Sequence, residues 1–209
     1  MTGEPANDRR ALHGMIFDLD GTLVDSALDF DAIRRDMRLP VGMPILESLE
    51  RIPAGSEKDR MLEVLRQHEL TGAARATLHD GVQEFLVWLD QRGIRRAVLT
   101  RNSRESTEIV FDRLGLHFEL TFTREDAPPK PDPTGLLTIC DVWQMQPAHV
   151  LFCGDYVFDL EAGSRAGMET LLFASRELPD FARQADYVLR SFHDASALID
   201  RHFVTARPS

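Results

Sequence analysis

Short apolar runs alternate with helical patterns along most of this 209-residue chain. The runs are rich in Val, Ile, Leu or Phe, which is the composition of strands buried on both faces. They occupy residues 14–19, 95–100, 118–122, 150–153, 170–173 and 187–189, and helical patterns occupy residues 82–91, 106–114, 134–143 and 160–166. This order predicts an α/β fold with an open parallel sheet and helices on both faces.

One segment, residues 27–78, interrupts the alternation because it contains helical patterns and no convincing strand. Its predicted helices cover residues 29–37, 44–52 and 57–69, and short turns containing Pro and Gly separate them. We therefore expect an α/β core formed by residues 1–26 and 79–209, with a small α-helical insert at 27–78 directly after the first strand.

Composition excludes several classes of partner. Lys and Arg number 24 against 34 Asp and Glu, a formal charge of −10, which argues against nucleic acid and anionic membranes as partners. No apolar run approaches the roughly 18 residues that a membrane span needs, and the first residues lack the apolar stretch of a signal peptide. Cys140 and Cys153 are too few for a disulfide framework, and their apolar surroundings indicate buried thiols. We expect a cytoplasmic protein.

Two carboxylates stand at the end of the first predicted strand. Asp18 and Asp20 are two residues apart, so at a strand end their side chains leave on the same side. Paired carboxylates repel, and one of them stays protonated unless a cation intervenes. The alternative is an Asp-Gly turn that only ends the strand, but packing gives no reason for an Asp-x-Asp pair after a continuous apolar run.

A second acidic pair, Asp155 and Asp159, follows the predicted strand at 150–153. The two residues are one helical turn apart if a helix opens near Val157, so both could face one site. The carboxyl ends of parallel strands form the edge where open α/β sheets bind ligands. A ligand set made only of oxygens suits Mg²⁺. Capping of a helix N-terminus by these acids is an equally good reading of this pair alone.

Two further places offer contacts to an anion. Thr100, Arg101 and Asn102 end a strand just before a helix, where side chains and backbone amides can bind an anion. Lys130 lies in a stiff Pro-rich loop and could present its ammonium group to a phosphate. Taken singly, capping by Asn102 and an ordinary surface lysine explain these residues as well.

In combination these residues resemble the four motifs of the haloacid dehalogenase superfamily. The matching runs are DLDGTLVDS from Asp18, Thr100, Lys130 in KPDP, and GDYVFD ending at Asp159. The chain is most similar to the phosphoglycolate phosphatase-like branch, which has a small helical cap. The resemblance implies a Rossmann-like core and places the insert at 27–78 in the position of that cap.

The resemblance also implies a role for each acid. Asp18 would be the nucleophile that forms an aspartyl-phosphate, and Asp20 would protonate the leaving alcohol and then activate water. Dehalogenases lack a carboxylate at the Asp20 position, so its presence favours phosphoryl transfer. The implied ligands of Mg²⁺ are Asp18, Asp20 through its backbone carbonyl, and Asp155, with Asp159 in support.

Thr100 and Lys130 would hold the phosphoryl oxygens. Many relatives have Asn directly after the Thr, whereas Arg101 stands there in this chain. Arg101 and Asn102 are therefore both candidate phosphate-binding residues, and Arg101 is a candidate for an extra anion contact. A second departure is Tyr156, which stands where relatives often carry Ser.

From these residues we expect a Mg²⁺-dependent phosphatase that acts on a small phosphomonoester, with phosphoglycolate as the family's example. A phosphomutase of the β-phosphoglucomutase type is the alternative, and a non-catalytic binding protein on the same fold is a third. Arg34, Arg35 and Arg51 of the insert are candidate substrate contacts, although a solvated helix face explains them too. We expect a monomer or a weak dimer.

Overall fold

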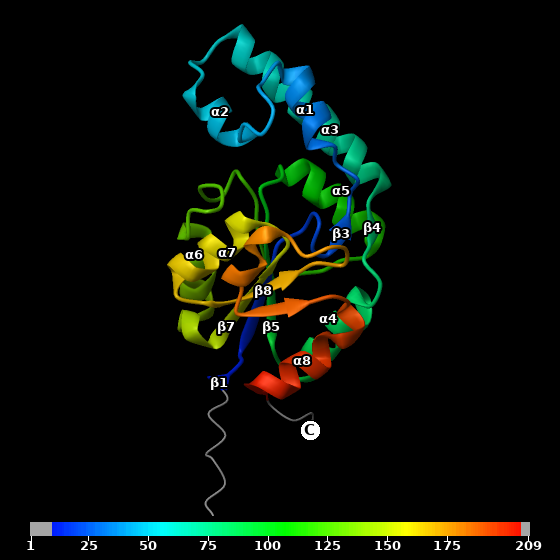
Figure 1. Ribbon diagram of the computed structural model, residues 1–209, viewed down its shortest axis with the longest axis vertical. Helices are drawn as coiled ribbons and strands as arrows, with labels where there is room; N and C mark the ends of the chain where they lie inside the picture. The colour runs from blue at the N-terminus through cyan, green and yellow to red at the C-terminus, as the bar shows by residue number, and fades with distance from the viewer. Residues whose placement is uncertain (1–9, 206–209) are drawn as a thin grey trace, which may run out of the picture.

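A six-stranded parallel sheet forms the centre of the computed structural model, which describes residues 10–205 (Figure 1). The strand order is β6-β5-β2-β7-β8-β9, and every neighbouring pair is parallel. The strands are β2 Gly14–Phe17, β5 Arg95–Leu99, β6 Leu120–Phe122, β7 Val150–Gly154, β8 Glu169–Phe173 and β9 Tyr187–Leu189. Each of them falls in a predicted strand region, so the open parallel sheet is confirmed, with strand ends that differ by up to two residues.

Helices cover both faces of this sheet. They are α4 Val82–Gln91, α5 Arg104–Leu114, α6 Thr134–Trp143, α7 Val157–Ala166 and α8 Ala195–His202. Successive side chains of β2 point to opposite faces: Met15 and Phe17 join the apolar cluster that includes residues of α4, α5 and α8. Ile16 joins a second cluster with residues of α6 and α7.

Two short strand pairs lie outside the main sheet and were not predicted. β1 Arg10–Ala11 pairs in parallel with β10 Phe203–Val204, and β3 Val24–Asp25 pairs antiparallel with β4 Thr77–Leu78. Two residues are too few to show a hydrophobic period, which is why the sequence pattern missed them. The β3–β4 pair brings together the two points where the chain leaves the core and returns to it.

Three helices lie between β3 and β4, beyond the carboxyl ends of the sheet strands (Figure 1). They are α1 Phe30–Met37, α2 Ile45–Arg51 and α3 Ser56–Arg75. They enclose an apolar cluster of their own, consisting of Ile33, Met37, Ile45, Leu49, Met61 and Leu65. α3 extends past its predicted end at residue 69, and a Cβ atom at Gly72 would lie 2.9 Å from Leu28 Cδ2. This close contact accounts for a glycine within the helix.

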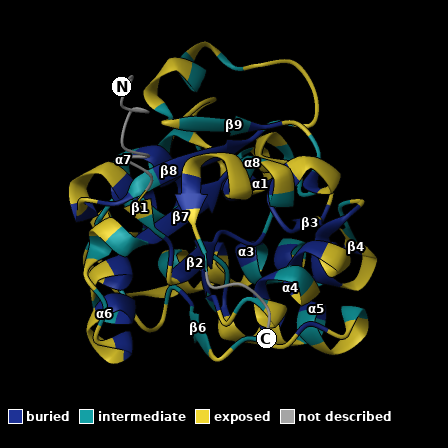
Figure 2. Cartoon of the chain, turned by 90° about the horizontal axis from the view of Figure 1, so that it is seen from below, coloured by how far each residue is buried: buried dark blue, intermediate teal, exposed yellow. Residues whose placement is uncertain are grey.

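Burial follows the same layering. In Figure 2 the central strands β2, β7 and β8 are buried, whereas the outer helices alternate between buried and exposed residues. Cys140 and Cys153 are both buried free thiols, as predicted. Among residues 10–205, no helix is both long enough and apolar enough to span a membrane.

Candidate active site

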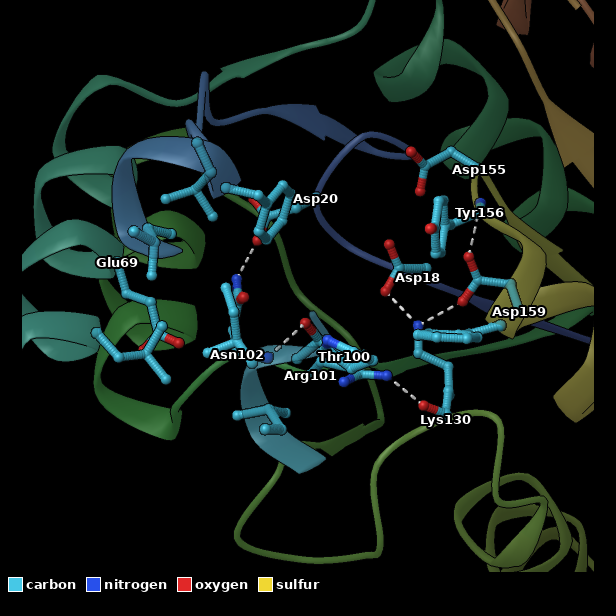
Figure 3. Close-up of a pocket in the computed structure, with 18 of the residues that line it drawn as sticks. Asp18, Asp20, Glu69, Thr100, Arg101, Asn102, Lys130, Asp155, Tyr156 and Asp159 are labelled. Carbon is cyan, nitrogen blue, oxygen red and sulfur yellow. Dashed lines mark hydrogen bonds and ion pairs between the residues drawn. The ribbon is translucent and has the colours of Figure 1, made fainter. Parts of the chain in front are cut away.

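A cavity of about 490 Å³ lies between the strand ends and the three helices of the insert. Its floor is polar and comes from the α/β core: Asp18, Asp20, Thr100, Arg101, Asn102, Lys130, Asp155 and Asp159. All eight residues predicted from the sequence as catalytic, phosphate-binding or metal-binding therefore line one cavity (Figure 3). They converge because they follow strands whose carboxyl ends share one edge of a parallel sheet.

Lys130 links two of the acids at the centre of the floor. Its ammonium group, which is almost inaccessible to solvent, contacts Asp18 Oδ1 and lies 2.6 Å from Asp159 Oδ1. Asp18 stands at the end of β2, where its N–H donates to the Cys153 carbonyl of β7 at 2.8 Å. The surface-lysine alternative is wrong, because Lys130 is 2% exposed.

Asp155 and Asp159 flank the start of α7. Asp159 Oδ2 accepts a hydrogen bond from the Tyr156 N–H at 2.9 Å, so the residue caps the helix and also pairs with Lys130. The capping reading of Asp159 is thus confirmed, and the same side chain also lines the cavity. Carboxylate oxygens of Asp18, Asp155 and Asp159 lie within 4.8 Å of one another, a separation that one cation could bridge.

Glycines let the backbone approach these acids closely. Gly21 has a φ of +80°, and a Cβ atom there would lie 2.2 Å from Asp155 Oδ2. At Gly154 a Cβ atom would lie 2.3 Å from the Asp159 Cβ and Cγ atoms. A larger side chain at Gly21 would displace the Asp155 carboxylate, and one at Gly154 would displace Asp159.

The three residues after β5, Thr100, Arg101 and Asn102, contact different partners. Thr100 is buried, and its Oγ1 accepts a hydrogen bond from the Asn102 N–H at 3.1 Å. The Asn102 amide group donates to Asp20 Oδ2. Arg101 points away from Asp20: its guanidinium group donates to the Lys130 carbonyl and, at 2.8 and 2.9 Å, to both carboxylate oxygens of Glu47 in α2.

Burial changes the protonation of the acids. Desolvation raises the pKa of Asp18 to about 7, and the nearby Asp159 and Asp20 carboxylates add to this effect while Lys130 opposes it. Desolvation likewise raises the pKa of Asp155 and that of Asp20. Burial lowers the pKa of Lys130, but Asp159 and Asp18 outweigh it and the net pKa is raised. The floor holds more negative charge than one lysine neutralises, which suits a divalent cation.

Sequence reasoning missed two acids of the insert that contact the core. Glu47 pairs with Arg101, and buried Glu69 of α3 contacts Arg124 and accepts a hydrogen bond from Ser103 Oγ at 2.8 Å. A signal existed for Glu69, because it continues the four-residue spacing of the buried Met61 and Leu65 along α3.

The arginines of the insert are only partly placed as expected. Arg34 lines the cavity, whereas Arg35 and Arg51 are exposed and do not line it. The prediction of substrate contacts is therefore retained for Arg34 alone.

The sequence model of a known protein family matches most of this chain. Residues 15–173 match the model described as haloacid dehalogenase-like hydrolase. The chain belongs to this family of enzymes. The resemblance found in the four sequence motifs is thereby confirmed.

Curated relatives agree with this assignment. A haloacid dehalogenase-like hydrolase domain-containing protein of Arabidopsis thaliana is 29% identical, over 97% of this chain and 90% of the relative. N-acetylmuramic acid 6-phosphate phosphatase of Pseudomonas aeruginosa is 30% identical, over 78% of this chain and 81% of the relative. Phosphoglycolate phosphatase of Aquifex aeolicus is 27% identical, over 91% and 98%. The similarity to the phosphoglycolate phosphatase-like branch is confirmed.

Solved structures share the fold. A predicted phosphoglycolate phosphatase from Haemophilus somnus superimposes with a TM-score of 0.70 at 21% identity, over 90% of this chain and 97% of the other. β-Phosphoglucomutase from Clostridium difficile gives 0.75 at 19% identity, over 92% and 97%. These likenesses confirm the Rossmann-like α/β fold.

Proposed function

We propose that this hydrolase is a Mg²⁺-dependent phosphatase that cleaves a small phosphomonoester through an aspartyl-phosphate on Asp18. The observation that carries the proposal is the convergence of Asp18, Asp155 and Asp159 within 4.8 Å around buried Lys130. The names of the relatives support the phosphoester class, since one is a sugar phosphate phosphatase and another acts on phosphoglycolate.

The chemistry proceeds in two steps. An Asp18 carboxylate oxygen attacks the phosphorus atom, the bond from phosphorus to the alcohol oxygen breaks, and Asp20 gives that oxygen a proton. Asp20 then takes a proton from water, whose oxygen attacks the phosphorus atom and releases inorganic phosphate and free Asp18. Lys130 and Thr100 are the groups we assign to the phosphoryl oxygens, where charge spreads in the transition state.

Asp20 is suited to both proton transfers. Burial raises its pKa, which favours the protonated form that the first step needs. The Asn102 amide group donates to its Oδ2 and fixes the orientation of the carboxyl group.

The oxygen donors fit Mg²⁺. We assign the Asp18 and Asp155 carboxylates and the Asp20 backbone carbonyl as its ligands, with Asp159 in support because Lys130 and the Tyr156 N–H already engage both of its oxygens. When bound, the cation supplies positive charge that offsets the repulsion between these acids and a phosphate dianion.

We assign residues 27–78 as a cap and residues 1–26 and 79–209 as the catalytic core. The cap forms the cavity's outer wall, where it would exclude water during phosphoryl transfer. Hydrolysis is favoured over the mutase alternative, because a bisphosphate needs a second anion site. Arg34 of the cap and Arg101 of the core, which pairs with cap residue Glu47, are both already paired with acids.

Release of inorganic phosphate from a panel of phosphomonoesters, with Mg²⁺ and after chelation, tests the proposal. We expect turnover of at least one ester with Mg²⁺ and its loss with chelator, restored by added Mg²⁺. Isomerisation of a sugar phosphate without net phosphate release would establish the mutase instead. No turnover of any ester or sugar phosphate would favour a binding protein.

A further inference from the structure

The outer wall of the cavity differs sharply from its floor. The cap contributes to this wall the charged side chains Arg34 and Glu69, each paired within the protein, and a set of apolar side chains: Leu28, Phe30, Ile33, Ile45, Leu46 and Leu65. Tyr156 and Phe158 of the core add aromatic rings. If phosphate binds on the polar floor, the alcohol of the ester faces this apolar wall. Burial of apolar groups there is favourable, whereas a charged group pays the cost of losing water without a partner.

The two arginines among the described residues that line the cavity, Arg34 and Arg101, already pair with acids. Arg34 donates from Nη1 to Asp31 Oδ1 and from Nε to the Met43 carbonyl, both at 2.9 Å. Arg101 donates from Nη2 to both carboxylate oxygens of Glu47 and from Nη1 to the Lys130 carbonyl. Arg101 lines the cavity, but Glu47 does not. The carboxylate of Glu47 thus offsets the charge of Arg101 from outside the cavity and takes up its Nη2 donors, which a substrate carboxylate would otherwise bind.

We propose that Glu47 is a specificity-determining residue: by neutralising Arg101, it makes the cavity select phosphate esters of uncharged, largely apolar alcohols over esters that carry a carboxylate. This inference rests on the proposed phosphatase function and deepens it. It also gives Arg101, which stands directly after Thr100, a partner within the protein.

A matched pair of substrates isolates the charge. Phosphoglycolate and its primary amide have nearly the same size and differ by one negative charge. For the wild-type protein with Mg²⁺, we expect kcat/KM to be at least about tenfold higher for the amide than for the acid. An equal or higher kcat/KM for phosphoglycolate would overturn the proposal.

Glu47→Gln removes the charge and keeps the length of the side chain. Because Arg101 then carries an unmatched positive charge, we expect the amide-to-acid ratio of kcat/KM to fall by about tenfold or more. Glu47→Gln/Arg101→Met should restore the wild-type ratio, since the freed cation is gone. Glu50→Gln, the same change at an exposed residue of the same helix, is the matched control and should leave the ratio unaltered.

A purely structural role for the pair gives a different result. If Glu47 and Arg101 only hold the cap on the core, Glu47→Gln lowers kcat/KM for both substrates equally and the ratio stays unchanged, which would refute the specificity role. Absence of phosphate release from every ester, in wild type and variants alike, would refute the phosphatase function instead. The two failures are therefore distinguishable.

Discussion

Asp20 and Asp18 differ in their surroundings although only Leu19 separates them. Asp18 contacts the Lys130 ammonium group, which favours its ionised form, while Asp20 accepts a hydrogen bond from the neutral Asn102 amide. Figure 3 shows the two carboxyl groups directed to different parts of the cavity. Burial raises the pKa of both acids, and Lys130 opposes this at Asp18 through a direct contact; on this difference we propose Asp18 as the nucleophile and Asp20 as the proton donor.

The variant Asp20→Asn tests whether Asp20 is the proton donor. We expect kcat/KM for alkyl phosphates to fall by about 10² to 10⁴-fold, because an alkoxide needs a proton to leave. The loss should be far smaller for p-nitrophenyl phosphate, whose phenolate leaves without protonation. Initial rates of phosphate release measure both losses, and Asp141→Asn, at an exposed position of α6, is the control. Equal losses on the two substrates would contradict the proton-donor role.

The sequence was sufficient to predict which residues meet on the floor. Asp18, Thr100 and Asp155 each follow an apolar strand, and parallel strands bring their carboxyl ends to one edge. The pairs Glu47–Arg101 and Glu69–Arg124 could not be predicted in the same way. Their partners lie 54 and 55 residues apart in the chain and meet only because the three cap helices dock over the sheet.

The turn after β2 determines how closely Asp18 approaches Asp155 and Asp159. Gly21 has a left-handed backbone, and its α-carbon lies against the Asp155 carboxylate. The backbone of this turn therefore places the pair Asp18 and Asp20 close to the pair Asp155 and Asp159.

Gly21→Ala should damage the site more than the fold. The left-handed conformation costs an alanine about 1–2 kcal/mol, and the added methyl group must displace Asp155. Gly167→Ala is a matched control, because Gly167 has a φ of +76° and no atom within 4 Å of an added Cβ. We expect both variants to lose similar thermal stability and only Gly21→Ala to need more Mg²⁺ for half-maximal activity. The same Mg²⁺ requirement in both variants would contradict this role of the turn.

At the element scale the sequence predicted the strands of the sheet and most helices, but it missed α8 and the two short strand pairs. Longer elements such as α4 and α6 show a clear apolar period, and their observed bounds equal the predicted ones. β1, β3, β4 and β10 have two residues each and depend on partners distant in the chain.

Across the whole molecule, ion pairs join the cap to the core on two sides of the cavity. Glu47 meets Arg101 on one side, and Glu69 meets Arg124 and Ser103 on the other. Desolvation raises the pKa of Glu69 above its ordinary value, although Arg124 opposes this. The folded protein therefore favours neutral Glu69 more than the unfolded chain does.

This shift gives a pH dependence of stability with a defined sign. The stabilising contribution of neutral Glu69 is complete below its unfolded pKa and is lost as pH rises through its folded pKa. Glu69→Gln is neutral at every pH, so the free energy of unfolding of the variant relative to wild type should increase from about pH 4 to about pH 8. Denaturant unfolding at several pH values measures it, with exposed Glu63→Gln as the control. A relative decrease would mean that the Arg124 pair outweighs burial.

The nucleophile is the central claim of this account, and phosphate release by Asp18→Asn tests it most directly. The assay uses the best ester of the panel with saturating Mg²⁺, and Asp141→Asn serves as the matched control. Because an asparagine amide cannot form the acyl phosphate, we expect kcat to fall by at least about 1,000-fold, with a cooperative unfolding transition retained. Phosphate release by Asp18→Asn at a rate near that of wild type would contradict the account.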